Sequence, residues 1–240
     1  MIYYDIHNPE SLAGEQLDEY LAKGWFRMQQ TIFTTDIIVK DSFLLPVFWL
    51  RLTIDKFIPS KKNKKTISLN NGFTVEYKEA IITDEMETLY QLYKSSVNFE
   101  LSNSIQENLL GESITSIYNT QSVSIRDNGK LIAVGFLDEG DISIAGILNI
   151  YHPEYANNGL GNYLMLLKVE YARKHQKQFY YTGYLSTVDN KFDYKLSVCK
   201  EATEVYNRNQ QQWVPWLSVQ KEKLDEWLVM NNDSNNGSSL

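Results

Sequence analysis

The sequence has little cysteine and no long apolar run. Cys199 is its single cysteine in 240 residues, which excludes an internal disulfide framework and a metal site built on several cysteines. No apolar stretch approaches the roughly 20 residues that a helix needs to span a bilayer. The N-terminus also lacks a signal-peptide pattern. We therefore expect a cytoplasmic protein with no membrane partner and no bound metal.

Positive charge is scarce as well: 23 Lys and Arg stand against 30 Asp and Glu, a formal net charge of −7. Such a chain has no overall basic field for nucleic acid, so we expect no DNA partner, and any contact with RNA must use a local patch. The dense positive cluster at 59–65 holds Lys61, Lys62, Lys64 and Lys65. Two interpretations stay open, a solvated loop or a phosphate-contacting patch that gains affinity by counterion release.

Apolar residues, by contrast, are plentiful: they make up 43% of the chain, with 16 Tyr and 5 Trp, enough for one good core or two small ones. The most informative stretch is 140–184. It begins with a run rich in Ile and Leu at 141–151, typical of a buried strand, which His152-Pro153 ends. From Leu160 the apolar residues follow helical spacing, and 178–184 is β-prone. The pattern predicts a β-α-β unit.

The turn that opens this helix contains Gly159 and Gly161. One interpretation is a tight chain reversal. The other is the pyrophosphate loop of the acetyltransferase-like (GNAT) superfamily, whose form resembles Gln/Arg-x-x-Gly-x-Gly/Ala. The spacing is kept from Ala156 to Gly161, but Ala156 stands where that loop has a long polar residue. Either way, Gly159, Gly161 and Asn162 are candidates to bind a phosphate through helix N-terminal amides.

The rest of the chain predicts an α+β or α/β fold with a mixed twisted sheet flanked by helices. We expect a small N-terminal α+β unit at 1–70, a GNAT-like transferase domain at 71–230 and a disordered tail at 231–240. Periodicity and turn signals predict helices at 11–23, 83–97, 105–110 and 221–230. They predict strands at 25–39, 43–54, 73–77, 123–126, 130–137, 192–195, 203–206 and 213–216.

Several phrases of the sequence resemble the aminoacyl-tRNA–protein transferases, the arginyl and leucyl transferases. The specific part is the second half, where the matching text is 149–155 (Asn-Ile-Tyr-His-Pro-Glu-Tyr), 160–163 (Leu-Gly-Asn-Tyr), 180–184 (Tyr-Tyr-Thr-Gly-Tyr) and 192–195 (Phe-Asp-Tyr-Lys). The first half resembles the family more loosely, at 20–27 and 51–65. The resemblance implies an aminoacyltransferase that adds an amino acid to a protein N-terminus. Aminoacyl-tRNA would be its co-substrate, with no resident cofactor.

The resemblance also suggests roles for particular residues. Tyr194, Lys195 and Glu154 would be catalytic, with Glu154 a proton acceptor and Lys195 able to hold a phosphate or an acidic side chain of the acceptor. The predicted substrate-binding residues are Trp25, Arg27 and Arg51 on an acceptor surface and the tyrosines Tyr151, Tyr181 and Tyr184. Tyrosine rings can stack on an unpaired terminal adenine, although tyrosines on central strands more often belong to the core.

Two departures from the family keep other functions open. The family's N-terminal cysteine cluster has no counterpart, and His152 stands where an aspartate usually precedes the proline. An acyl-CoA-dependent N-acetyltransferase that uses acetyl-CoA is one alternative. A non-catalytic member that binds tRNA or protein N-termini is the other.

Overall fold

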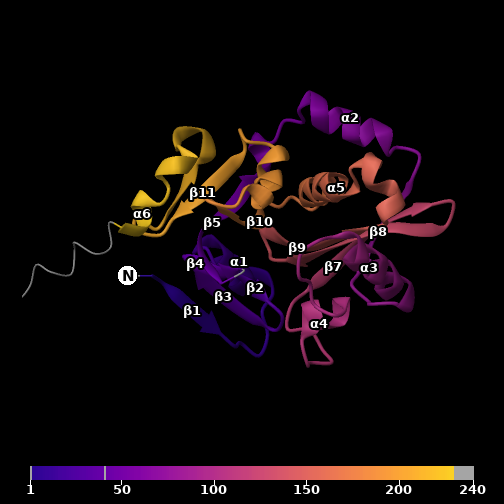
Figure 1. Ribbon diagram of the computed structural model, residues 1–240, viewed down its shortest axis with the longest axis horizontal. Helices are drawn as coiled ribbons and strands as arrows, with labels where there is room; N and C mark the ends of the chain where they lie inside the picture. The colour runs from indigo at the N-terminus through magenta and orange to yellow at the C-terminus, as the bar shows by residue number, and fades with distance from the viewer. Residues whose placement is uncertain (1, 41, 230–240) are drawn as a thin grey trace, which may run out of the picture.

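A nine-stranded mixed sheet forms the centre of the computed structural model, which describes residues 2–40 and 42–229 (Figure 1). Eight strands follow the order β12-β11-β5-β10-β9-β8-β7-β6, and β4 pairs with β5 outside this path. In chain order they are β4 (Ile37–Lys40), β5 (Phe43–Thr53), β6 (Thr74–Glu79), β7 (Thr120–Asp127), β8 (Lys130–Glu139), β9 (Ser143–Tyr151), β10 (Phe179–Ser186), β11 (Thr203–Asn207) and β12 (Gln212–Pro215).

Helices cover both faces of this sheet. The helix α5 (Leu160–Lys174) crosses one face, and α2 (Lys61–Leu69) lies outside α5 (Figure 1). The helices α3 (Asp84–Ser96) and α4 (Ile105–Leu110) cover the other face beside a small N-terminal unit. The short helices are η1 (Ile54–Lys56), η2 (Pro153–Asn158), η3 (Asn190–Ser197), η4 (Trp216–Ser218), η5 (Lys221–Lys223) and α6 (Glu226–Val229).

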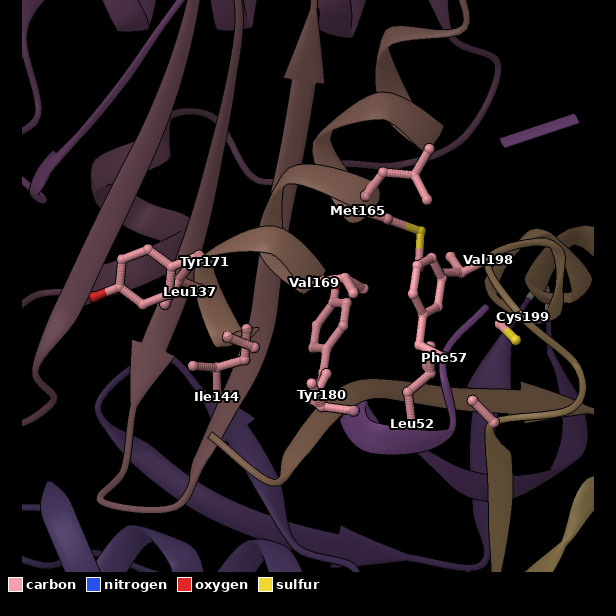
Figure 2. Close-up of a cluster of buried hydrophobic side chains, with 14 residues drawn as sticks. Leu52, Phe57, Leu137, Ile144, Met165, Val169, Tyr171, Tyr180, Val198 and Cys199 are labelled. Carbon is pink, nitrogen blue, oxygen red and sulfur yellow. The ribbon is translucent and has the colours of Figure 1, made fainter. Parts of the chain in front are cut away.

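The core between α5 and the sheet follows the alternation of strand side chains. On β9 and β10, Ile144 and Tyr180 point to the α5 face, while their neighbours Ala145 and Tyr181 pack against the N-terminal unit. Figure 2 shows the α5 side of this core, where Tyr180 lies close to Val169 of α5. Burying apolar side chains on both faces at about 25 cal/mol per Å² is the main stabilising contribution to such a sheet, and it fixes the strand register.

The strands β9 and β10 are the one parallel pair in the large sheet, and they pair over only three residues each. Ser143–Ala145 pairs with Phe179–Tyr181. Beyond these residues β9 continues to Tyr151 and β10 to Ser186, and the two strands no longer pair with each other. Both strands stay paired on their outer sides, to β8 and β5. We call this stretch, in which β9 and β10 are not paired with each other, the β9–β10 gap. It leaves two rows of backbone polar groups without strand partners.

The N-terminal unit consists of a three-stranded sheet in the order β1-β3-β2 and the helix α1. Its elements are β1 (Tyr4–His7), α1 (Gly14–Ala22), β2 (Phe26–Met28) and β3 (Thr31–Thr35). The following strand, β5, lies in the large sheet between β10 and β11. A division into 1–70 and 71–230 stays a prediction. The strand β5 lies within 1–70 in sequence, but it pairs with strands of the second unit in the central sheet.

The predicted GNAT-like fold class is confirmed in its mixed sheet, flanking helices and small N-terminal sheet. The hairpin of β7 and β8 is also confirmed, with Asn128 and Gly129 at positive φ in its turn. Two element predictions were wrong: residues 192–195 form part of the 3-10 helix η3 rather than a strand, and 221–230 contains the two short helices η5 and α6 rather than one helix. The basic run at 61–65, for which two interpretations stayed open, forms the start of α2.

The predicted tail at 231–240 lies outside the described residues. Within 2–40 and 42–229, none of the helices combines the length and the apolar character that crossing a membrane requires.

Candidate functional site at the gap between β9 and β10

Lys195 is the most unusual group at the β9–β10 gap. It comes from η3, which follows β10, and only 9% of its surface is exposed. Its Nζ donates a hydrogen bond to the carbonyl oxygen of Tyr184 at 2.5 Å. Aromatic rings surround the ammonium: its Nζ lies 4.7 Å from the ring centre of Tyr184, 5.1 Å from that of Phe192 and 5.8 Å from that of Tyr194. We call these three rings and Lys195 the lysine enclosure.

The enclosure supplies no negative charge. Among the described residues no carboxylate lies within ion-pair distance of the Lys195 Nζ, and burial alone lowers the pKa of its ammonium to about 7. Three aromatic faces offset part of the desolvation through cation–π attraction, but a buried ammonium without a counter-ion remains costly. The enclosure is therefore suited to receive an anionic group.

Tyrosines from four different elements gather beside the enclosure. The ring of Tyr93 on α3 meets that of Tyr151 at the end of β9 edge to face, with centres 5.1 Å apart. Tyr194 is 53% exposed, but burial of its hydroxyl end, together with the hydroxyl of Tyr184, raises its pKa. Burial, and then the hydroxyls of Tyr151 and Tyr194, raise the pKa of Tyr93 to about 12. The hydroxyls of Tyr93 and Tyr194 thus stay protonated at neutral pH and can donate hydrogen bonds to a substrate.

The N-terminus of α5 reaches the same place. Gly159 precedes the helix at φ 62°, a backbone conformation that glycine adopts without strain, and no side chain caps the first turn. The amide oxygen of Asn162 accepts a hydrogen bond from the Ser197 hydroxyl of η3 at 3.1 Å, while its buried Nδ2 has no partner among the described residues. Gly161 lies against the ring of Tyr151. The turn thus offers free N–H donors next to the tyrosines.

The helix α2 brings the basic cluster to this end of α5. Ser60 caps α2 by accepting a hydrogen bond from the Asn63 N–H. The buried side chains of Asn63 and Asn70 donate to the carbonyl oxygens of Val198, just after η3, and Asn158, just before α5, at 2.6 and 2.9 Å. The helix is therefore fixed beside both sides of the site.

The lysines of α2 face away from this anchor. Lys61, Lys62, Lys64 and Lys65 are all exposed, while Asn63 between them is buried. They occupy the first turns of the helix, where the helix dipole disfavours cations. Their combined charge makes this surface attractive to a polyanion.

Ion pairs from several elements hold η3 in place. Lys40 at the end of β4 contacts Asp189 at 2.5 Å, and Lys221 of η5 contacts Asp193 at 2.7 Å. On the other side, Lys191 lies over the ring of Phe99, which belongs to the connection between α3 and α4. The segment that carries Tyr194 and Lys195 thus spans from the hairpin of β4 and β5 to the α3 side.

The structure shows where two residues of the predicted acceptor surface lie. Trp25 is buried among Tyr20 and His7. Arg27 pairs with Asp138 at 2.7 Å and also donates to backbone and hydroxyl oxygens, so no N–H of its fork faces an open surface. Both side chains join the N-terminal unit to the sheet in buried positions, and their part in binding an acceptor protein stays a prediction.

Two further substrate-binding predictions fall on the opposite face from α5. Arg51 pairs with Glu204 at 2.8 Å and stacks between the rings of Phe179 and Trp213. The buried hydroxyl of Tyr181 lies 3.5 Å from the Arg51 guanidinium. This group packs the N-terminal unit onto the sheet, so Arg51 and Tyr181 are structural here, while Tyr151 and Tyr184 do lie at the gap.

The contacts of Glu154 are not with residues of the lysine enclosure. Its side chain is 75% exposed, on η2, and its carboxylate is 3.7 Å from both Lys130 and His152. Neither Tyr194 nor Lys195 is among its described contacts. The structure thus places this exposed carboxylate beside the β7–β8 turn, and its catalytic role stays a prediction.

Sequence analysis missed Tyr93 and Ser197. Tyr93 lies within the helix predicted at 83–97, and only the fold shows that its ring meets that of Tyr151. Ser197 follows the Tyr-Lys phrase by two residues, yet its partner Asn162 is 35 residues away. No local pattern reports such a contact.

Comparisons with known proteins show a family and several relatives. Residues 85–203 match the family model "Arginine-tRNA-protein transferase, C terminus". An aspartate/glutamate leucyltransferase of Leptospira interrogans is 25% identical over 223 residues, which cover 90% of this chain and 85% of that protein. One of Shewanella putrefaciens is 29% identical over 152 residues, 61% of this chain and 63% of that protein. The crystal structure of FemX has a TM-score of 0.44 and 12% identity, covering 79% of this chain and 65% of that one.

The matched residues include β9, α5, β10 and the lysine enclosure, and α2 lies outside them, so residues 85–203 belong to the arginine-tRNA-protein transferase family. The predicted resemblance and the enzyme class are confirmed: this is an aminoacyl-tRNA-dependent protein transferase.

Proposed function

We propose that the protein transfers leucine from leucyl-tRNA to the N-terminal amine of proteins that begin with Asp or Glu. The observation that carries this proposal is the lysine enclosure, a buried ammonium with no carboxylate partner at the β9–β10 gap. The relatives named aspartate/glutamate leucyltransferase support both the donor and the acceptor class.

In this proposal the acidic side chain of the acceptor enters the enclosure and pairs with Lys195. A carboxylate restores the missing counter-ion, and its hydrogen bond with the ammonium is charge-assisted. The neutral Asn or Gln side chain of the same shape lacks that charge. Charge-assisted hydrogen bonds contribute about 1.5–3 kcal/mol, so the expected discrimination is on the order of 10- to 100-fold.

The donor lies across the N-terminus of α5. Lys61, Lys62, Lys64 and Lys65 contact phosphates of the tRNA, and the amides at Gly161 and Asn162 contact a phosphate near its 3′ end. The N–H of Gly159, by contrast, already donates to the carbonyl oxygen of Ala156. Tyr151 and Tyr184 hold the terminal adenosine and the ester between their rings. The free Nδ2 of Asn162 is a further donor for this end of the RNA.

The reaction needs orientation more than acid–base help. The acceptor amine attacks the ester carbon, a C–N bond forms, the ester C–O bond breaks, and the ribose oxygen leaves with the proton that the amine loses. The α-amine has a pKa near 8, so a fair fraction is neutral at physiological pH. Holding amine and ester together supplies most of the acceleration, and the protonated hydroxyl of Tyr194 donates a hydrogen bond to the developing negative charge.

Transfer of radiolabelled leucine to matched peptides tests the proposal. Leucyl-tRNA and arginyl-tRNA are each incubated with the enzyme and peptides that begin with Asp, Asn, Glu or Gln. We expect transfer from leucyl-tRNA to the Asp and Glu peptides, at least about 10-fold above the Asn and Gln peptides. Transfer from arginyl-tRNA alone would overturn the donor, and absence of any transfer would overturn the activity in favour of a binding module.

A pair of lysine variants tests the role of the enclosure. Lys195→Met should lower the Asp-to-Asn ratio towards one, because it removes the charge and keeps an unbranched side chain. Lys200→Met is the control, since Lys200 is exposed on the same segment. An unchanged Asp-to-Asn ratio in Lys195→Met would contradict the assignment.

A further inference from the structure

A bulge interrupts the pairing of β9 with β8 where the gap opens. Phe136 pairs with Leu148 and Leu137 with Gly146, so Ile147 of β9 has no opposite residue on β8. The last residue of β9 that pairs with β10 is Ala145, two residues before Ile147. A bulge leaves its extra residue outside the ladder and bends the strand. Here the bend lies two residues from the point where the pairing with β10 ends.

The ammonium of Lys168 lies on this bulge. Lys168 comes from the middle of α5, and 1% of its surface is exposed. Its Nζ donates to the carbonyl oxygens of Phe136 and Leu148 at 2.7 and 3.2 Å and to the amide oxygen of Asn149 at 2.7 Å. The three N–H groups of the ammonium thus have three oxygen acceptors, one on β8 and two on β9.

The sheet leaves room for this contact at one position. Gly135 of β8 faces α5 directly beneath the lysine. A Cβ at Gly135 would lie 2.8 Å from the Asn149 amide oxygen and 3.1 Å from the Lys168 Cε. Any larger residue would push the lysine and the asparagine apart, so glycine here allows both side chains to reach the bulge.

Burial of the Lys168 ammonium in this space costs desolvation free energy. No carboxylate lies within ion-pair distance of its Nζ among the described residues, and burial lowers its pKa to about 7 in spite of the more distant charge of Asp138. An apolar side chain would avoid the desolvation. What an apolar side chain would not do is satisfy the carbonyl oxygens that the bulge exposes.

We propose that Lys168 is a positioning residue for the transfer reaction, and that its ammonium fixes the bulge of β9 and thereby the shape of the β9–β10 gap. The inference rests on the proposed function only for its kinetic consequence. Lys168 does not touch the substrates; it acts through the backbone at 146–149, which forms the β9 side of the gap. A small displacement of that edge changes the alignment of the ester with the attacking amine, to which rates are sensitive.

The test compares Lys168→Met with Lys168→Gln, which retains two N–H donors, and with Lys174→Gln, an exposed lysine of the same helix. Hydrogen exchange followed by mass spectrometry is measured on the full chain. In Lys168→Met we expect faster exchange of the amides at 146–151, with amides at 122–126 of β7 unchanged. Lys168→Gln should lie between Lys168→Met and the unaltered protein, and Lys174→Gln should match the latter.

Kinetics supply the second measurement. With leucyl-tRNA and an Asp peptide, Lys168→Met should lower kcat by about 10- to 100-fold and leave KM for the tRNA within about twofold, with partial rescue by Lys168→Gln. Uniformly faster exchange across the sheet, or a normal kcat despite local exchange, would overturn the proposal. If the unaltered protein transfers nothing, the proposed function fails, while the exchange pattern still decides whether Lys168 fixes the bulge.

Discussion

At the residue scale, two buried lysines distinguish this molecule. Lys168 and Lys195 both come from elements that border the β9–β10 gap, and both ammonium groups meet neutral partners only. Lys195 faces aromatic rings, whereas Lys168 faces the carbonyl and amide oxygens of the bulge. The Lys195 ammonium has one hydrogen-bond acceptor, whereas that of Lys168 has three, which is why we propose binding for one and positioning for the other.

The lowered pKa of Lys195 predicts a dependence of stability on pH. Between pH 7 and 9 the unfolded chain keeps a proton on this lysine, whereas the native chain, which is about half protonated at pH 7, loses its proton as the pH rises. The free energy of unfolding should therefore rise with pH over this range. Lys195→Met should reduce the rise by roughly 1–2 kcal/mol, measured by urea denaturation at pH 7, 8 and 9. The same slope in both proteins would contradict the burial of a neutral amine.

The ion pair of Arg27 with Asp138 predicts a large local effect on stability. Both side chains are almost fully buried, and Asp138 keeps one carboxylate oxygen without a partner among the described residues. Removing the arginine leaves an unpaired buried carboxylate, so Arg27→Ala should lower the free energy of unfolding by about 3–5 kcal/mol. Lys78→Ala, which breaks the exposed pair with Glu76, is the control and should cost less than about 1 kcal/mol. Equal losses in urea denaturation would contradict this account.

At the element scale, α2 is fixed by its neighbours more than by its own sequence. Its first turns carry four lysines, which the helix dipole disfavours. The buried asparagines at 63 and 70 tie it to the chain on either side of the site. Those contacts cross 135 and 88 residues of sequence, so local pattern predicted a basic cluster there but not a helix.

The basic surface of α2 predicts a change in the salt dependence of tRNA binding. Replacement of Lys61, Lys62, Lys64 and Lys65 by Gln should make the slope of log K against log salt less negative by up to about 3, because each phosphate contact contributes about 0.7–0.9. Filter binding between 50 and 200 mM salt measures it. Lys78→Gln, on the β6 edge, should leave the slope unchanged. Equal slopes for the fourfold variant and the unaltered protein would exclude α2 from the RNA interface.

Sequence alone predicted the elements whose signals are local. The strand, glycine turn, helix and strand at 140–184, the cap at Thr83 and the Asn-Gly hairpin all lie within short windows, and the structure contains each of them. The catalytic role of the phrase that contains Tyr194 and Lys195 stays a prediction. The sequence could not show which side chains are buried. Arg27 and Arg51 are residue types common in binding surfaces, and only the fold shows that each is already paired with a carboxylate.

At the scale of the whole molecule, β5 joins the two ends of the chain. This strand follows the N-terminal unit in sequence and pairs with β10 on one side and β11 on the other. Arg27 and Trp213 add contacts of the N-terminal unit with β8 and of β12 with α1. The molecule should therefore behave as one cooperative unit.

Truncation tests that cooperativity. A chain restricted to 71–229 lacks β5, and β10 and β11 lose their common neighbour, so we expect no native transition on heating. The full chain should unfold in a single transition, with equal calorimetric and van't Hoff enthalpies. A folded 71–229 fragment, recognised by dispersed amide resonances, would show that the second unit is independent.

The indole of Trp49 lies edge to face with the ring of Tyr184, with centres 5.4 Å apart, and Tyr184 is a wall of the lysine enclosure. An intrinsic fluorophore is thus only one ring removed from the buried ammonium. When an acidic peptide neutralises that charge, the electric field across the indole changes and its emission shifts. Binding of acceptor peptides can in this way be titrated optically on the unlabelled enzyme, before any amino acid is transferred.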